Sequence, residues 1–345
     1  MMRAWLIRSL LLLCLAATSL AATAPSQVPA DQQRSAEQTL LTFPEWFLVH
    51  SPAQYARMLR EQPSHDFPFL RQTGQLWNSY YLVTREQISG HYPSNPGYHL
   101  MIMVLAVSTS VEYGLRSAYE NTLGRISWAL GGATQTDEDR FAAQAAQEYV
   151  DFIRQEPWYL FDFGSRLKRL WADVPLTGPG MVRKWERRYA LTTEFVIKAA
   201  YGKLIEKATR ATYEVALMNT DVVIAPPPSG LHLPEHVTVL KTLADGRQLL
   251  SLPRYFDFRI AATALANQGV QITDIAGNSG PILVTLWLDD SQPLPTEAGR
   301  VLFTQAIDTP QHTRRVGLLL PVGQLSAFLR NAPAHHWLVE HVHDY

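Results

Sequence analysis

The sequence predicts an α+β fold in which a mainly α-helical N-terminal domain precedes a small α+β domain. Residues 40–216 consist of long segments without Gly or Pro, separated by short Gly/Pro-rich turns, as in helical proteins. The run Pro-Pro-Pro-Ser-Gly at residues 226–230 ends this pattern, and short Val/Ile/Leu-rich runs follow. We therefore predict a helical domain over residues 40–225 and an α+β sandwich domain over residues 231–345.

The N-terminus has the composition of a secretory signal peptide. Arg3 and Arg8 supply positive charge, and residues 10–17 are apolar and lead into small side chains. Because this run is shorter than the roughly 20 residues of a spanning helix, we predict a cleaved signal peptide over residues 1–21 rather than an anchor. Residues 22–39 are small, polar and proline-containing, as in a flexible tether. We expect export to the periplasm or cell envelope.

Composition excludes several classes of function. Cys14 is the only cysteine and lies in the leader, so the exported chain has no disulfide, thiolate metal site or cysteine nucleophile. Two of the 30 basic residues lie in the leader, and the 31 acidic residues outnumber the rest by three, so we expect no nucleic-acid partner. The sequence lacks the GxSxG, Walker, GxGxxG, HExxH and EF-hand motifs.

The C-terminal part alternates predicted strands with two predicted helices. No internal repeat is visible, and a ferredoxin-like arrangement, with helices on one face of a mainly antiparallel sheet, is our preferred topology. The predicted strands are residues 237–243, 270–275, 282–288, 301–307, 315–320 and 337–342, and the predicted helices are residues 256–268 and 323–331.

Residues 98–128 are expected to form one long helix that is apolar on all sides between Leu100 and Val107. Such a helix is buried in protein or in lipid. Because the strongly apolar part is short, we favour a core helix over a membrane span.

Three charged residues follow on this helix at i,i+4 steps. Arg116 can reach Glu112 and Glu120 on one face, and a second long helix places Glu194 among basic neighbours. We favour structural ion pairs. The catalytic alternative makes Glu112 a desolvated carboxylate with a raised pKa that acts as an acid, base or metal ligand, with Arg116, Glu120 and Glu194 nearby.

The segment from residue 166 to 210 is rich in cations and aromatic rings. Basic side chains beside Trp and Tyr suit a headgroup layer, whereas the alternative is a solvated helix whose aromatic rings fill the core. The predicted membrane-surface residues are Arg166, Lys168, Arg169, Trp171, Arg183, Lys184, Trp185, Arg187 and Arg188.

His341 and His343 would project from one face of a terminal strand because side chains alternate along strands. Such a pair can hold zinc or another divalent ion if a third ligand comes from elsewhere, such as His312. A terminal strand with incidental histidines is the simpler interpretation. We therefore expect no cofactor, with a divalent metal as the alternative.

Three segments, Thr42-Phe43-Pro44-Glu45-Trp46-Phe47, residues 116–122 and residues 340–345, resemble segments of uncharacterised bacterial envelope-associated proteins. The resemblance implies a shared pair of domains and transfers no activity and no catalytic residue.

We predict a non-catalytic envelope protein whose helical domain docks on an anionic membrane surface or on an envelope protein. One alternative is a metal-dependent enzyme that uses His341 and His343 or Glu112. The other is a periplasmic protein that binds a small ligand in a pocket between its domains.

Overall fold

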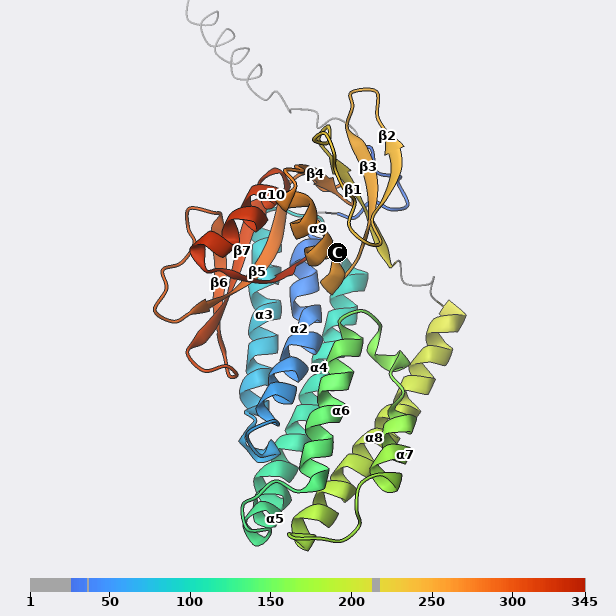
Figure 1. Ribbon diagram of the computed structural model, residues 1–345, viewed down its shortest axis with the longest axis vertical. Coiled ribbons are helices and arrows are strands. Elements are labelled where there is room, and N and C mark those ends of the chain that lie inside the picture. The colour runs from blue at the N-terminus through green and yellow to red at the C-terminus, as the bar shows by residue number, and fades with distance from the viewer. Residues whose placement is uncertain (1–25, 36, 213–217, 345) are drawn as a thin grey trace, which may run out of the picture.

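The computed structural model describes residues 26–35, 37–212 and 218–344, with side chains described up to residue 207 in the second range. It has an elongated bundle of helices with two antiparallel sheets at one end (Figure 1). This confirms the predicted α+β class with a helical N-terminal region. The predicted signal peptide, residues 1–21, lies outside the described residues.

The bundle helices begin where the sequence supplies caps. Asn95 accepts a hydrogen bond from the Tyr98 amide in front of α4, and Thr136 and Asp139 form a capping box at the start of α6. The bundle contains α2 (Gln38–Met58), α3 (Phe69–Ser89), α4 (Pro96–Tyr119), a π-helical turn (Glu120–Gly124), α5 (Arg125–Leu130), α6 (Asp137–Ile153), α7 (Phe163–Ala172) and α8 (Met181–Thr212).

The C-terminal part contains two sheets of four strands with the same connectivity. Their strand orders are β2-β3-β1-β4 and β6-β7-β5-β8, and a helix precedes the last strand of each. The elements are β1 (Asn219–Ile224), β2 (Thr238–Thr242), β3 (Gln248–Pro253), α9 (Phe256–Asn267), β4 (Ile272–Ile275), β5 (Pro281–Asp289), β6 (Arg300–Ile307), β7 (Thr313–Pro321), α10 (Val322–Asn331) and β8 (Leu338–Val342). The structure therefore contains an internal duplication that the sequence does not reveal.

Two sheets replace the single sheet of the expected ferredoxin-like arrangement, so that finer prediction is wrong. The predicted strands and helices of this part are nevertheless present. Two strands, β1 and β3, are absent from the predicted set; β1 precedes residues 226–230 and pairs with β3 and β4. The boundary at residue 225 therefore needs correction, because β1 belongs to the first sheet.

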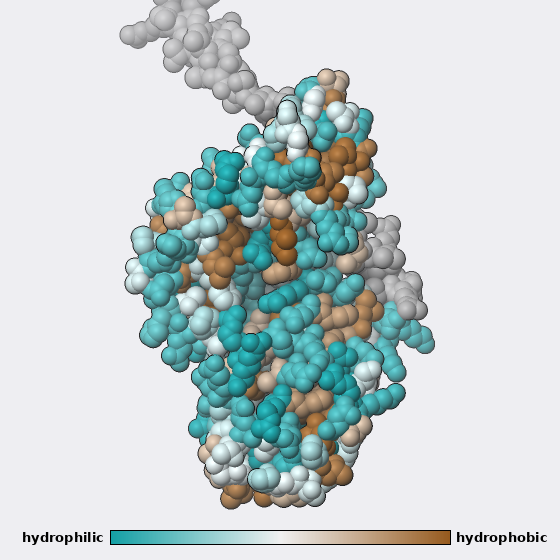
Figure 2. Space-filling view, in the orientation of Figure 1, coloured by the Kyte–Doolittle hydropathy of each residue, from teal (hydrophilic) through white to brown (hydrophobic). Residues whose placement is uncertain are grey.

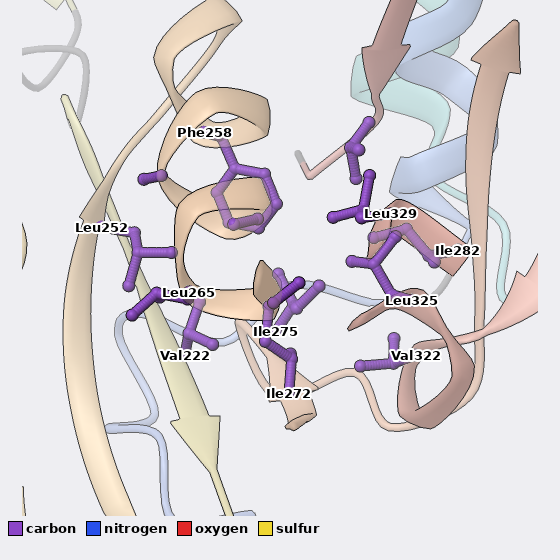
Figure 3. Close-up of a cluster of buried hydrophobic side chains, with 14 of the residues drawn as sticks. Val222, Leu252, Phe258, Leu265, Ile272, Ile275, Ile282, Val322, Leu325 and Leu329 are labelled. Carbon is purple, nitrogen blue, oxygen red and sulfur yellow. The ribbon is translucent and has the colours of Figure 1, made fainter. Parts of the chain in front are cut away.

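The main hydrophobic core lies between the two sheets. Leu252 of β3, Phe258 of α9, Ile282 of β5 and Leu325 of α10 point toward one another there (Figure 3). Burying both helices against both sheets removes apolar surface from water, which is the dominant favourable contribution to folding. The two βββαβ units thus form one folded body.

The outer faces of the two sheets are also covered. Phe303 of β6 stacks on Phe43 of α2, with ring centroids 4.3 Å apart, in a cluster that joins the second sheet to α2, α3 and α4. Val28 packs under the first sheet, and the Arg34 amide donates to the carbonyl of Ala276 at 2.7 Å. Where a flexible tether was predicted over residues 22–39, the described residues 26–35 dock on the first sheet, and α2 begins at Gln38.

Candidate functional site

An exposed apolar stripe runs along α4, which lies behind α2 and α6 in the view of Figure 1. Side chains three or four residues apart share one side of a helix. The stripe comprises Leu100, Val104, Val107, Val111 and Leu115, each at least 50% exposed. The near surface over the bundle, by contrast, is mainly hydrophilic (Figure 2).

The stripe corrects our prediction of a core helix. Only Ile102, Ala106, Thr109 and Tyr113 of α4 are buried. The helix packs on α3 and α2 along one side, so a segment that is apolar all round is left with an uncovered side. Among the described residues, one helix, Pro96–Leu130, is long and apolar enough to cross a membrane by length and composition.

The neighbouring helix α8 adds exposed apolar and aromatic side chains. Tyr189, Val196, Ile197 and Leu204 are exposed on it. Ion pairs of Arg116 with Glu194 and of Lys198 with Glu112 link α4 to α8. We call the exposed stripe on α4, from Leu100 to Leu115, the apolar surface. Contiguous apolar patches above a few hundred Å² are rare on soluble monomers and mark interaction sites.

The ion pairs between α4 and α8 are structural. Arg116 pairs with Glu112, at 3.1 Å, and with Glu194, and Lys198 donates to Glu194 at 2.9 Å. Against the opposing effect of burial, Lys198 and then Arg116 lower the pKa of Glu112. For Glu194, burial raises the pKa, but the charges of Arg116 and Lys198 outweigh this effect and lower the pKa to about 2. The alternative of Glu112 as a carboxylate with a raised pKa is therefore wrong.

Glu120 does not continue the predicted ladder to Arg116. It lies in the π-helical turn, accepts a hydrogen bond from Ser64 at 2.7 Å and pairs with Arg187 at 2.8 Å. A π turn inserts an extra residue in the helix and rotates the following side chains. Glu120 therefore faces α8 and the loop before α3.

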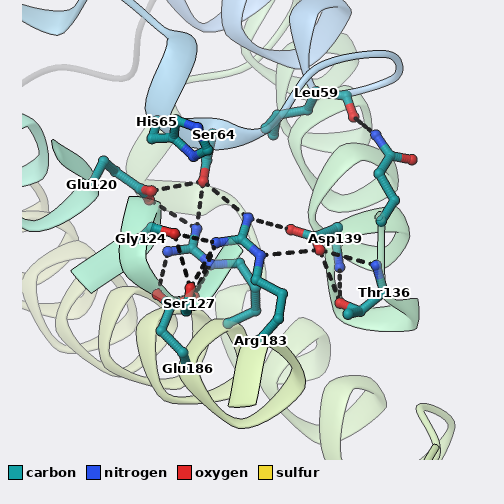
Figure 4. Close-up of polar contacts among 12 residues, drawn as sticks. Leu59, Ser64, His65, Glu120, Gly124, Ser127, Thr136, Asp139, Arg183 and Glu186 are labelled. Carbon is teal, nitrogen blue, oxygen red and sulfur yellow. Dashed lines mark hydrogen bonds and ion pairs between the residues drawn. The ribbon is translucent and has the colours of Figure 1, made fainter. Parts of the chain in front are cut away.

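A buried polar network around Arg183 and Arg187 ties α8 to the rest of the bundle (Figure 4). Arg183 donates to Asp139 at 2.6 Å and to the carbonyl of Gly124 at 3.1 Å, and Arg187 and Arg183 both pair with Glu186. These side chains have their hydrogen bonds satisfied inside the protein. The network therefore fixes helix positions.

Four of the predicted membrane-surface cations are consequently buried. Arg183, Lys184, Arg187 and Arg188 have side chains exposed by 4% or less, and Glu138 pairs with both Lys184 and Arg188. Charged and apolar residues alternate along α8 as they do on a solvent-exposed helix, but acidic side chains from α6, the π-helical turn and α8 itself pair with these cations. The assignment of these four residues to a lipid surface is wrong.

The other predicted membrane-surface residues lie nearer to solvent. Arg166 and Arg169 both pair with Glu148, and Lys168 is exposed. Trp171 and Trp185 are 46% and 44% exposed, with their rings 6.3 Å apart in an edge-on arrangement. This aromatic pair is available for contact beside the buried network.

His341 and His343 are buried against α2. The ring of His341 lies 3.6 Å from that of Trp46, and His343 contacts Phe43 edge-on and Thr42 at 3.3 Å. Burial lowers the pKa of His341 well below its usual value and lowers that of His343 to about 3. Within the described residues, no group of three or more His, Cys, Asp or Glu side chains is placed to hold a metal. The alternative in which His341 and His343 bind a divalent metal ion is therefore not supported.

No protein-family model, curated protein or solved structure matches this chain.

The apolar surface is the feature that sequence reasoning missed. Its signal was present as apolar residues at positions 100, 104, 107, 111 and 115. The same segment carries further apolar residues between these positions, so the stripe could not be distinguished from a helix that is apolar on all sides. The partners of α4 decide which side stays uncovered.

Proposed function

We propose that this is an exported cell-envelope protein that docks on an anionic membrane surface through the apolar surface of α4. The observation that carries the proposal is the uncovered stripe of Leu100, Val104, Val107, Val111 and Leu115. Transfer of each such side chain out of water is favourable by ~1.5–3 kcal/mol. The predicted signal peptide at residues 1–21 supports the proposed location in the cell envelope.

Cations and rings on α8 favour lipid headgroups as the occupant. Lys203 and Lys207 are exposed and follow Tyr189 and Val196 at spacings of seven, seven and four residues. These spacings put all four on one side of α8, which is opposite the side of Glu194 and Lys198 that pairs with α4. Lysines attract anionic lipids, and tyrosines are enriched at the membrane interface.

We propose surface contact rather than a membrane span. Glu112 directly follows Val111, Arg116 directly follows Leu115, and both are tied to Lys198 and Glu194 of α8. Crossing the bilayer would require ~20 apolar residues and would carry these charges into lipid. With α4 lying along the membrane plane, the ion pairs stay inside the bundle and the stripe enters the interface.

Flotation with vesicles that contain phosphatidylglycerol tests this proposal. We expect the wild-type protein to float with them at low salt, and we expect Val107→Glu to reduce the floated fraction about tenfold because a charge would enter the interface. Gln144→Glu is the matched control, since Gln144 is exposed on α6 and the change adds the same charge.

Two outcomes would contradict the proposal. One is wild-type protein that remains at the bottom of the gradient at low salt. The other is a dimer in sedimentation that Val107→Glu converts to a monomer without any vesicle binding, which would assign the apolar surface to a second copy of the chain.

A further inference from the structure

A small pocket lies where the helical bundle meets the sheets. Trp46, His50 and Arg57 of α2 and Arg154, just after α6, line it from the bundle, and Trp287 of β5 is among the residues that line it from the sheets. Its volume is about 50 Å³. A water molecule accounts for about 30 Å³ in the liquid, so the pocket accepts a group of a few heavy atoms.

Three guanidinium groups gather around this pocket. Arg57 lies 4.8 Å from the ring of Trp287, whereas Arg154 and Arg259 lie 5.2 and 4.7 Å from the ring of Phe256. Burial, and next the charge of Arg154, lower the pKa of both Arg57 and Arg259. The cations therefore repel one another, and a bound anion would relieve this repulsion.

The carboxylate in the pocket lining is already neutralised. Glu340 of β8 lines the pocket and accepts two hydrogen bonds from the buried Arg315, at 2.5 and 2.7 Å. Such a bidentate pair is among the stronger ion pairs in proteins. Arg154 pairs with the carboxylate of Asp151, at 3.2 Å, and Asp151 is 59% exposed. The lining therefore keeps a positive balance.

Two polar atoms of the lining residues are buried and have no hydrogen-bond partner within the described part of the chain, Nε1 of Trp287 and Nε2 of His50. Trp287 offers an N–H donor. Burial, and next the charge of Arg315, lower the pKa of His50 well below its usual value, so its ring is neutral at pH 7. With Nδ1 3.3 Å from Glu340, a hydrogen on Nδ1 would leave Nε2 as an acceptor.

The start of α9 adds to the positive potential. Phe256 is the first residue of α9 and lines the pocket, and Tyr255 before it provides no side-chain cap. The N-terminal end of a helix carries partial positive charge and favours anions. Cations, an N–H donor and an acceptor for a protonated oxygen thus surround one small space.

We propose that this pocket binds a small oxyanion that carries a hydroxyl, with hydrogen phosphate, free or as a monoester, as the best match. Arg57 and Arg154 would pair with its charge, Trp287 would donate to it, and His50 would accept its O–H. A carboxylate group with a neighbouring hydroxyl has the same recognition chemistry. The site is separate from the apolar surface and does not depend on membrane binding.

Calorimetric titration of the purified protein with inorganic phosphate, and separately with lactate, tests this proposal without vesicles. We expect one saturable site for at least one of these probes. Arg57→Gln and Arg154→Gln should each raise the Kd about tenfold or more, because each removes a charge-assisted hydrogen bond. Arg60→Gln is the matched control, since Arg60 is exposed one turn beyond Arg57 on the same chain segment and pairs with Gln147.

Saturable binding of phosphate alone supports a phosphoryl ligand, and binding of lactate alone supports a hydroxy-carboxylate. Arg154→Gln keeps the test informative if Arg57→Gln does not fold, because the Arg154 side chain is 32% exposed. Absence of saturable binding of both probes would overturn the proposal. So would binding that Arg154→Gln leaves unchanged or that Arg60→Gln weakens equally.

Discussion

The histidines near the C-terminus are packing residues with an energetic cost. His341 is 1% exposed, and both of its ring nitrogens lack a hydrogen-bond partner within the described chain. Its contacts are the ring of Trp46 and the ring of His343, 4.8 Å away. Charging this imidazole would place an uncompensated cation in the interior. Because the imidazole of His341 stays uncharged in the folded protein, it should make the free energy of unfolding depend on pH.

We predict that His341→Phe makes the protein less sensitive to acid. Because burial lowers the pKa of His341 in the folded state, the unfolded chain binds the extra proton below pH ~6.5, and stability falls as the pH falls. Between pH 7 and pH 5 the wild type should lose about 2 kcal/mol more than the variant. Urea unfolding at the two pH values measures this difference.

The control for this comparison is His232→Phe, at an exposed position. Its loss of unfolding free energy between the two pH values should match that of the wild type. Equal acid sensitivity of His341→Phe and the wild type would show that His341 is not held neutral.

Short-range sequence patterns predicted where the helices and strands lie, but they did not predict which residues of other elements these helices and strands contact. The strands of the second sheet follow from Val/Ile/Leu runs between turns, and all are present. β1 was missed because residues 219–224 form one short run directly before the Pro-rich break. The burial of Arg183 and Arg187 could not be predicted, because it depends on Asp139, Glu120 and Glu186 meeting them in space.

Because the buried arginines depend on their acidic partners, removing one partner should destabilise the bundle. Asp139→Asn should lower the free energy of unfolding by about 3 kcal/mol, because it removes the charge of the carboxylate that pairs with Arg183, whose side chain is fully buried. An asparagine has one carbonyl oxygen and cannot accept from both the Thr136 amide and Arg183, so the loss includes part of the capping box. Chemical denaturation followed by circular dichroism measures the difference.

Asp151→Asn is the matched control on the same helix. Its partner Arg154 is partly exposed, and exposed ion pairs contribute little. The expected change is below about 1 kcal/mol. An equally small effect of Asp139→Asn would contradict a structural role for the network.

The whole molecule has a continuous series of layers. Val28 covers the first sheet, α9 and α10 fill the space between the sheets, and the second sheet packs on the ends of α2, α3 and α4. The sequence predicts the two-part organisation, but not this shared packing, because the contacts join residues more than 200 positions apart, such as Phe43 and Phe303. Within the part of the chain that the structure describes, the layers leave one side of α4 exposed, and our account of function depends on this side.

A fluorescent probe on α4 tests that account most directly. Cys14 is the only cysteine, so Cys14→Ser allows a single NBD label to be attached at Val107→Cys, or at Gln144→Cys on α6 as the control. With phosphatidylglycerol vesicles we predict a blue shift and an intensity increase for the label at position 107, and no change at position 144. No change at position 107, or the same change at both positions, would contradict membrane docking through the apolar surface.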